Sequence, residues 1–322
     1  MKTKEAILKQ FISQSNQYIS GEELANSLQL SRTSIWKAVH ELKSEGYEID
    51  SVTSKGYRFH FPSRLSKEII EFLLGNHSRI GRVEFKKITD STQNDAKRLA
   101  LNPINQDVLV VSEYQTQTRG RFGRQYFVPE SEDFISMSLL TLPNSIFIEV
   151  SQYTLLAAAA VVKAIEKLTH IKMSIKWVND IYLNGKKICG ILSEAITDIE
   201  SNQITSIIIG IGLNFSIPQE VFPKELQRKA TSLFSEEIPF ITRNELIAEI
   251  WKQFYRLMDT DFVKIYRQHS FVFGRRVSFM ENNKIYAGIA KQVTDTGDLV
   301  VFLDDGTTKL LHSGEISLSK ID

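Results

Sequence analysis

The chain has 322 residues, with 39 lysines and arginines against 38 aspartates and glutamates, and 42% of its residues are hydrophobic. Since a typical domain has about 150 residues, this length predicts two domains or three smaller ones. The charge balance excludes a protein that coats nucleic acid or membranes by bulk charge. A single cysteine excludes an intrachain disulfide and a cysteine-rich zinc site, and no histidine pair has metal-binding helical spacing. The sequence has no apolar stretch of about 18 residues and no signal-peptide core at its N-terminus, so we expect a soluble cytoplasmic protein.

Three short helices are the first predicted elements. Thr3 to Ser13 places its apolar residues on one face. Ser20 begins a capping box that starts a second helix near Gly21. Ser31 caps a third helix, which ends at Gly46. Two capped helices joined by a short turn predict a helix-turn-helix.

A predicted β-hairpin, Ile49 to Val52 and Tyr57 to Phe61, completes a winged helix-turn-helix domain over residues 1–62. The start of the third helix and the hairpin tip present side chains that can reach phosphates and base edges. These DNA-binding candidates are Arg32, Thr33, Ser34, Trp36, Lys37 and Lys55. A module used for protein contacts is the alternative, but the polar first turn favours DNA. With 8 basic against 7 acidic side chains, one copy should bind weakly, so we expect dimers on two half-sites.

Residues 63–269 predict an α+β domain with a mixed sheet. The expected strands are Val83–Ile88, Val108–Glu113, Phe134–Leu142, Met173–Trp177, Ile188–Ile196 and Ile204–Asn214. The expected helices are Leu65–Leu74, Glu149–Leu168 and, as the last one, Asn244–Met258. The small residues Ala157 to Ala160 should let the long helix lie close against the sheet.

Four segments of this domain are too polar or too rich in glycine for a simple core. Asp90 to Asp95 either caps a helix or hydrogen-bonds a ligand at a strand end. Gln115 to Tyr126, with three arginines and two glycines, either wraps an anion or is a solvated loop. Lys176 to Tyr182 places a cation beside amide and carboxylate oxygens, or is an ordinary turn. Gly210 to Asn214 either lets a ligand lie against the backbone or marks a bulge.

Short strands and turns follow from residue 270 to residue 322 and predict a small antiparallel β-barrel. The expected strands are Arg276–Met280, Ile285–Val293, Leu299–Leu303 and Thr308–His312. The simplest role for this C-terminal domain is to cap the central domain.

In this order the segments resemble the bifunctional biotin–protein ligases that double as biotin operon repressors. The matching motifs are Asp90-Ser-Thr, Gln115 with Arg119-Gly-Arg121, Gly123-Arg124, Lys176-Trp with Asn179-Asp180, Lys187-x-x-Gly190-Ile-Leu, Gly210-Ile-Gly-Leu-Asn214 and Ala230-Thr-Ser-Leu233. The likeness covers essentially the whole chain, and the N-terminal module indicates the regulatory form. It implies a class II synthetase-like catalytic domain and an SH3-like C-terminal barrel that borders the ATP and acceptor site.

The resemblance implies that biotin and MgATP form biotinyl-5′-AMP, from which biotin passes to a biotin carboxyl carrier domain. It also implies that biotinyl-5′-AMP is the corepressor, favouring a homodimer that binds operator DNA. The implied catalytic residues are Lys176, Arg119 and Arg121. The implied biotin-binding residues are Ser91, Thr92, Gln93, Gln115, Arg119, Gly120, Arg121, Lys176, Gly210 and Gly212. The implied ATP-binding residues are Arg124, Tyr126, Asn179, Asp180, Lys187 and Asn214.

Departures from the family pattern leave alternatives open. Thr118 replaces a glycine, and a β-branched residue resists positive φ, so loop closure could be altered. Val178 replaces a proline, Gln93 an asparagine and Tyr126 a tryptophan. The charged residues are retained, which favours an active enzyme. One alternative is a ligand-gated repressor with weak or no ligase activity, and another is a lipoate-type ligase.

Overall fold

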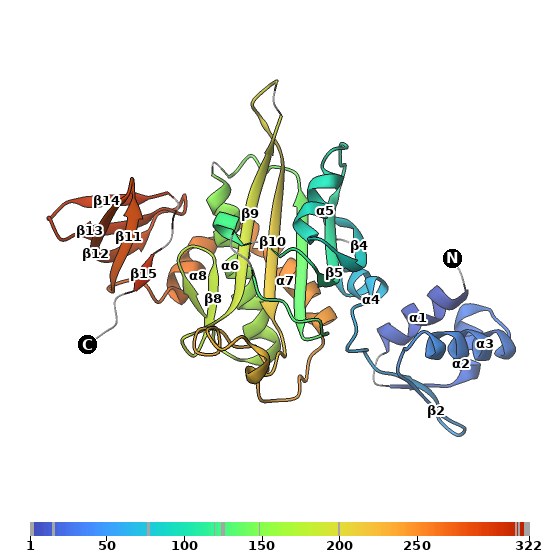
Figure 1. Cartoon of the computed structure of the whole chain (residues 1–322). Coiled ribbons are helices and arrows are strands. Elements are labelled where there is room, and N and C mark those ends of the chain that lie inside the picture. Colours follow the sequence, from blue (N-terminus) through green and yellow to red (C-terminus); the bar gives the residue numbers. More distant parts are fainter. Residues whose placement is uncertain are drawn as a thin grey trace.

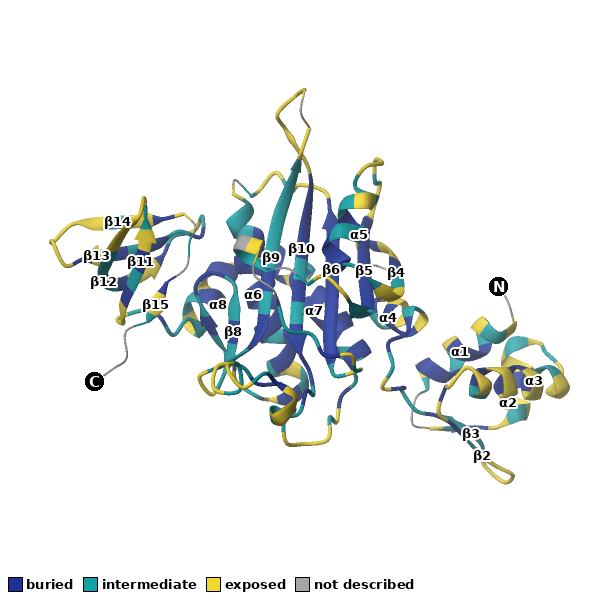
Figure 2. Cartoon of the chain, in the orientation of Figure 1, coloured by how far each residue is buried: buried dark blue, intermediate teal, exposed yellow. Residues whose placement is uncertain are grey.

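The structure is a computed structural model that describes residues 3–14, 17–75, 78–118, 120–123, 126–147, 149–198, 200–312, 314 and 316–318. Three β-sheets organise these residues, and the large central sheet lies between a small N-terminal module and a small C-terminal sheet (Figure 1). Buried residues concentrate in the central strands and helices, whereas the tip that joins β9 (Lys186–Thr197) to β10 (Ile204–Asn214) is exposed (Figure 2). Among the described residues, no helix is long and apolar enough to cross a membrane.

The N-terminal module contains the predicted helices and hairpin. Its elements are α1 (Thr3–Ser13), β1 (Tyr18–Ile19), α2 (Gly21–Leu28), α3 (Arg32–Ser44), β2 (Ile49–Val52) and β3 (Gly56–Phe59). The Ser20 hydroxyl accepts from the N–H of Glu23 at 3.0 Å and the Ser31 hydroxyl accepts from that of Ser34 at 3.1 Å, which confirms both N-caps. The strands pair in the order β1–β3–β2, and the helices pack a separate core around Phe11, which is fully buried.

The central sheet is mixed, as predicted. Its seven strands are ordered β4–β5–β6–β10–β9–β8–β7, and all neighbours are antiparallel except β4 and β5. The bounds of the other strands are β4 (Ile80–Thr89), β5 (Asp107–Gln115), β6 (Phe134–Thr141), β7 (Ser174–Lys176) and β8 (Asp180–Leu183). The two faces of the sheet are covered differently, because alternate residues of β5 join different cores: Leu109 packs with the main core and Val110 with a smaller one.

Helices cover both faces. The helices are α4 (Lys67–Leu74), α5 (Thr92–Leu99), α6 (Val150–Thr169), α7 (Arg243–Met258) and α8 (Phe262–His269), with short 3-10 turns at Arg121–Gly123 and Gln219–Val221. The long helices α6 and α7 form the main core with one face, and Ala157 to Ala160 are fully buried there, as expected for close packing. On the opposite face, Ala96 of α5 packs with Val108 and Val110, and next to it the sheet stays open.

One prediction about the central elements was wrong, and one strand was not predicted. The helix over residues 244–258 is not the last, because α8 follows it, and the side chain of Asp261 caps α8 by accepting from the N–H of Lys264 at 2.9 Å. The segment Lys176 to Tyr182 contains a turn over residues 177–179, but Asp180 then begins β8, which pairs with both β7 and β9. Both α8 and β8 are short, so their formation depends more on packing and strand pairing than on the periodicity of apolar residues.

The C-terminal strands form an open sheet in the described residues. The strands are β11 (Arg276–Glu281), β12 (Lys284–Val293), β13 (Leu299–Leu303), β14 (Thr308–Leu311) and β15 (Ser317–Leu318), in the order β14–β13–β12–β11–β15. Between the described residues of β14 and β15 no pairing closes a barrel. The sheet is fastened to the central domain: the indole N–H of Trp177 donates to the Gly297 carbonyl at 3.0 Å, and the Ser151 hydroxyl donates to the Thr296 carbonyl at 2.6 Å.

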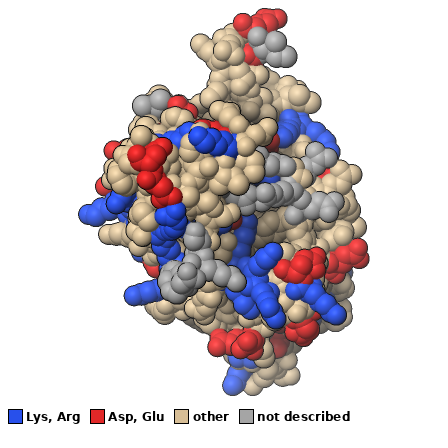
Figure 3. Space-filling model, turned by 60° about the vertical axis from the view of Figure 1, so that its left-hand side comes forward, with Lys and Arg blue, Asp and Glu red and all other residues tan. Residues whose placement is uncertain are grey.

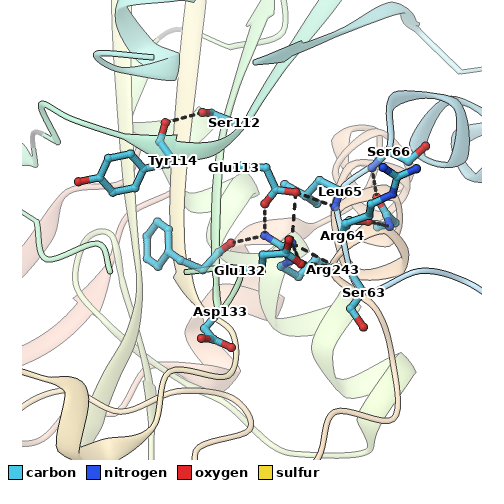
Figure 4. Close-up of polar contacts among 12 residues, drawn as sticks. Ser63, Arg64, Leu65, Ser66, Ser112, Glu113, Tyr114, Glu132, Asp133 and Arg243 are labelled. Carbon is cyan, nitrogen blue, oxygen red and sulfur yellow. Dashed lines mark hydrogen bonds and ion pairs between the residues drawn. The ribbon is translucent and has the colours of Figure 1, made fainter. Parts of the chain in front are cut away.

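Buried polar residues at the start of α7 hold the segment that follows the N-terminal module. The side chain of Arg243, 1% exposed, forms an ion pair with Glu113 of β5 at 2.7 Å and donates to the carbonyls of Phe134 at 3.2 Å and Ser63 at 3.2 Å (Figure 4). Asn244 donates to the Arg64 carbonyl at 2.9 Å and accepts from the N–H of Ser66 at 2.9 Å. We call Arg243, Asn244 and Glu113 the linker clamp.

Candidate functional site

A cavity of about 230 Å³ lies on the open part of the sheet, beside the N-terminus of α5. Gly210 of β10 faces Ser138 of β6 in its floor, on the same side of the sheet as α5. The cavity brings together 13 of the predicted site residues: Ser91, Thr92, Gln93, Gln115, Gly120, Arg121, Tyr126, Lys176, Asn179, Asp180, Lys187, Gly210 and Gly212. The four polar or glycine-rich segments of the sequence therefore meet at one site.

One end of the cavity carries amides and hydroxyls. The Ser91 hydroxyl caps α5 by accepting from the N–H of Gln93 at 3.2 Å, as predicted for a helix start. The Gln115 side chain accepts from the N–H of Thr92 at 2.6 Å and donates to the Ser136 hydroxyl at 3.0 Å. Neutral donors and acceptors in fixed positions suit a small polar ring rather than an ion.

The two predicted glycines make room for protein side chains. A Cβ atom at Gly210 would lie 2.4 Å from Oε1 of Gln93, and one at Gly212 would lie 3.1 Å from the ring of Phe134. Both glycines also line the cavity. A larger residue at position 210 would displace the Gln93 amide, so glycine there is a requirement of the site and not a simple bulge.

The other end is cationic. The described lining residues include three cations, Arg121, Lys176 and Lys187, and one carboxylate, Asp180. Oδ1 of Asp180 lies 2.5 Å from the Lys187 ammonium. Basic and acidic side chains are interspersed on the face of the molecule shown in Figure 3. Three cations beside one anion suit a ligand that brings carboxylate and phosphate groups.

Arg121 reaches this end from the loop before β6. Its guanidinium donates to the Asn179 side chain at 3.3 Å and to the Gly314 carbonyl at 3.2 Å. Gly314 belongs to the segment after β14, so the C-terminal part of the chain helps to form the cavity wall. Asn179 in turn donates to the Ile191 carbonyl at 2.8 Å, which fixes the start of β8.

Aromatic rings form a further wall. The ring of Tyr126 lies 5.7 Å from that of Phe134 and 5.6 Å from the Lys187 ammonium. Burial raises the pKa of Tyr126 well above its usual value, so the phenol stays neutral and can serve as an apolar platform. Gly190 permits this position, because a Cβ there would lie 3.3 Å from the Tyr126 ring.

Three predicted residues are not seen in the lining. Arg119 and Arg124 lie outside the described residues. Asn214 lies behind Tyr126, 2% exposed, and donates to the Thr231 carbonyl at 2.8 Å, so its ATP-binding role stays a prediction. Trp177 lines the cavity although no role in the site was predicted for it.

Sequence reasoning also missed Ser136 and Ser138. These hydroxyls alternate with apolar residues in β6, a strand that is otherwise buried and apolar. Because alternate residues of a strand lie on the same face, this pattern in the sequence already indicated two hydroxyls on one face of β6. The contribution of Gly314 had no comparable signal, because it depends on how two domains pack.

The backbone strain expected at Thr118 is absent. Thr118 does not have a positive φ, so its β-branched side chain meets no left-handed backbone there. Its hydroxyl donates to the Tyr126 carbonyl instead and ties together the two ends of the arginine-rich loop. The replacement of glycine therefore adds a closing contact in this chain.

Five of the six candidate DNA-contacting residues are exposed, and Ser34 is half-buried. Trp36 is 54% exposed and its ring stacks on His40 at 4.8 Å between centroids. Arg32 is exposed but forms an ion pair with Glu22 of α2. The Ser34 hydroxyl lies 2.8 Å from that of Ser31, so it takes part in the helix cap. Thr33, Lys37 and Lys55 are also exposed.

Three segments of the chain match known families. Residues 3–58 match the HTH domain, residues 85–214 match the biotin/lipoate A/B protein ligase family, and residues 272–319 match the biotin protein ligase C terminal domain. The middle match contains all the described cavity residues except Gly314.

Whole relatives match over nearly the full length. The bifunctional ligase/repressor BirA of Bacillus subtilis is 35% identical over 97% of both chains, and that of Escherichia coli is 25% identical over 94% of this chain and 93% of its own. Among solved structures, the biotin protein ligase from Aquifex aeolicus in complex with biotin and ATP has a TM-score of 0.61 and 26% identity, covering 74% of this chain and 99% of that one.

Proposed function

The chain belongs to the family of bifunctional biotin–protein ligases and repressors, and we propose that it uses its cavity to activate biotin for two purposes. One is transfer of biotin to a carrier protein, and the other is repression of transcription in response to biotin. The observation that carries the proposal is the division of one cavity into a neutral polar end and a cationic end. Biotin has the matching polarity, with a cyclic urea at one end and a carboxylate at the other.

In the first step, a biotin carboxylate oxygen attacks the α-phosphorus of MgATP. A carboxylate–phosphate bond forms, the bond between the α- and β-phosphates breaks, and pyrophosphate leaves, giving biotinyl-5′-AMP. Negative charge gathers at the cationic end of the cavity, where Lys176, Lys187 and Arg121 stabilise it. We assign Lys176 to the reacting carboxylate and α-phosphate, and Tyr126 to the adenine ring.

Mg²⁺ enters as part of the MgATP substrate. The described lining offers one carboxylate, Asp180, which is already paired with Lys187. Elsewhere in the described chain no group of three or more histidine, cysteine or acidic side chains could hold a metal ion. Mg²⁺ is commonly bound through one or two carboxylates and substrate phosphates, so this site fits a metal that arrives on the nucleotide.

In the second step, a neutral lysine amine of the carrier domain attacks the acyl carbon of the adenylate, and AMP leaves. No covalent enzyme intermediate is required. Cys189 does not supply one, because it is buried in β9 and burial raises the pKa of its thiol well above the usual range. The adenylate is prone to hydrolysis, so the loop tied by Thr118 would need to exclude water until the carrier arrives.

For repression, we propose that α3 enters the major groove and that the β2–β3 hairpin acts as a wing. Biotinyl-5′-AMP would order the loop from Gln115 to Tyr126 and favour a homodimer that binds two half-sites. By reciprocity, operator DNA would stabilise the adenylate-bound dimer. The proposed domain limits are 1–62, 63–269 and 270–322, the last an SH3-like domain, in a soluble cytoplasmic protein.

Pyrophosphate release from MgATP tests the enzyme assignment. With biotin, the purified protein should release pyrophosphate and form biotinyl-5′-AMP. Binding of biotin without pyrophosphate release would instead identify a ligand-gated repressor. Activity with lipoate that excess biotin does not inhibit would identify a lipoate-type ligase.

A further inference from the structure

A chain of polar side chains runs from the surface into the polar end of the cavity. The Lys97 ammonium lies 2.9 Å from Oε1 of Glu194, and Oε2 of Glu194 accepts from Nε2 of Gln93 at 2.8 Å. The Ser138 hydroxyl donates to Oε1 of Gln93 at 3.0 Å and lies 2.9 Å from the hydroxyl of Thr92. Gln93, Ser138 and Thr92 line the cavity, whereas Lys97 and Glu194 are outside its lining.

The surroundings of the Gln93 amide fix which way it points. Its Nε2 faces the Glu194 carboxylate and, at 3.5 Å, the Ile208 carbonyl. Both groups can only accept, since the carboxylate is paired with an ammonium and a carbonyl carries no hydrogen. The amide nitrogen must therefore point to them, and Oε1 must point to Ser138. All the polar atoms of Gln93 are thus engaged within the protein.

This orientation determines the direction of the next two hydrogen bonds. Ser138 has one hydroxyl hydrogen and gives it to Gln93. In the contact between Thr92 and Ser138, Thr92 must then be the donor. With its hydrogen used, the Thr92 oxygen can only accept from a ligand. Beside Thr92, the Gln115 side chain donates one amide hydrogen to Ser136, and its second amide hydrogen can be donated to a ligand.

We infer that Glu194 and Lys97 are positioning residues that make the Thr92 hydroxyl an acceptor and so select a ligand with an N–H group at that point. The inference rests on the proposed function, since a cyclic urea offers both the N–H and the neighbouring carbonyl that this pair of side chains would recognise. It also accounts for Gln93, where the resemblance leads one to expect asparagine: its amide spans the distance from Ser138 to Glu194. Gln93 thereby orients the site and leaves biotin contact to Thr92 and Gln115.

Glu194→Gln tests the inference by allowing the relay to reverse. A carboxamide can present N–H to Gln93, whose amide can then turn over and donate to Ser138. Ser138 would donate to Thr92, and the Thr92 hydrogen would point into the cavity. Ser138→Ala should also turn the Thr92 hydroxyl hydrogen into the cavity, because the variant lacks the hydroxyl oxygen that accepts this hydrogen in the wild-type protein.

The readout is substrate choice, measured as kcat/KM for pyrophosphate release. The three substrates are biotin and the two cyclic carbamates in which one or the other ring N–H is replaced by oxygen. The wild-type protein should prefer biotin by roughly 100-fold over the carbamate that sets an oxygen against Thr92, because a buried acceptor is left unpaired. Glu194→Gln and Ser138→Ala should each reduce this preference about 10-fold, through a higher KM for biotin more than through kcat.

Glu84→Gln is the matched control. Glu84 is in β4, its side chain is 32% exposed against 33% for Glu194, and it pairs with Arg82 at 3.3 Å. This variant should keep the wild-type preference. Wild-type preference in both Glu194→Gln and Ser138→Ala would overturn the inference while leaving the ligase assignment intact. A wild-type protein that releases no pyrophosphate with biotin would instead overturn the proposed function.

Discussion

At the scale of single residues, the cations of the cavity differ in how they are held. Lys187 is paired with Asp180 at 2.5 Å, and Arg121 is anchored to Asn179 and Gly314. In the described part of the chain Lys176 makes no ion pair, so its ammonium is available for charge that develops during the reaction. It lies at the end of β7, where the neighbouring Trp177 is fixed by its hydrogen bond to Gly297.

Lys176→Met should lower kcat for pyrophosphate release by about 100-fold or more, because a charge aimed at the transition state is lost. The near-equal length of the two side chains should leave the thermal unfolding curve in place. Lys172→Met removes an exposed lysine four residues upstream and serves as the control, with wild-type kcat expected. An active Lys176→Met enzyme would refute the role given to this lysine.

Asp90, next to the cap of α5, should contribute stability that depends on pH. Hydrogen bonds from Arg98 and Asn94 hold the pKa of this carboxyl well below its usual value of about 4. A group with a depressed pKa in the folded state stabilises above its unfolded pKa, and this contribution is lost as the pH falls toward the folded value. The difference in free energy of unfolding between the wild-type protein and Asp90→Asn should therefore be largest at pH 7 and shrink below about pH 4. A difference that grows in acid would contradict this account.

At the scale of elements, the linker clamp joins α7 to β5, to β6 and to the segment that follows the N-terminal module (Figure 4). Glu113 lies two residues before Gln115, and the Phe134 ring lines the cavity. The clamp therefore contacts the same two strands that support the ligand site. A buried guanidinium with carboxylate and carbonyl partners is costly to disrupt, because removing it leaves Glu113 unpaired.

Arg243→Met should destabilise the protein by about 3–5 kcal/mol, measured as the free energy of unfolding in urea. Arg276→Met is the comparison: Arg276 pairs with Asp304 at a site where both side chains are about half exposed, so its loss should cost less than about 1 kcal/mol. An equal loss of unfolding free energy in the two variants would show that burial of the linker clamp adds nothing to its contribution to stability.

Elements with strong periodicity or caps could be predicted from the sequence, and elements defined by pairing could not. Thr3 to Ser13 and Ile204 to Asn214 have the expected bounds, because an amphipathic face or an apolar β-branched run marks each one. The four residues of β8 carry no such pattern and exist because β7 and β9 flank them. In the site, motif residues could be predicted, whereas the Gln93–Glu194 contact joins positions 101 residues apart and could not.

At the scale of the whole molecule, a ligand cavity and a DNA-reading surface lie in one chain whose charges nearly cancel. A net charge close to zero at first argues against binding to nucleic acid, but it suits a repressor whose single copy binds DNA weakly. Doubling the contacts in a dimer raises affinity steeply, since each phosphate contact adds to the salt-dependent term. Trp36 and Lys37 are exposed on α3, and we propose that they contribute to this surface.

Biotin together with MgATP should shift the protein toward a dimer in sedimentation velocity, and biotin alone should shift it less. The same condition should strengthen binding to DNA upstream of biotin genes in gel shifts, with affinity falling as salt rises. Lys37→Ala, which lies on α3 away from the cavity, should weaken DNA binding without altering dimer formation. DNA binding that is indifferent to ligand would leave the N-terminal module a protein-contact domain.

Transfer of biotin to a purified biotin carboxyl carrier domain tests the central claim most directly. With MgATP and biotin, each carrier should gain one biotinyl group on a lysine, with one AMP and one pyrophosphate released. Lys176→Met should slow this transfer by about 100-fold or more. A carrier that stays unmodified while the wild-type protein binds biotin would contradict the ligase function.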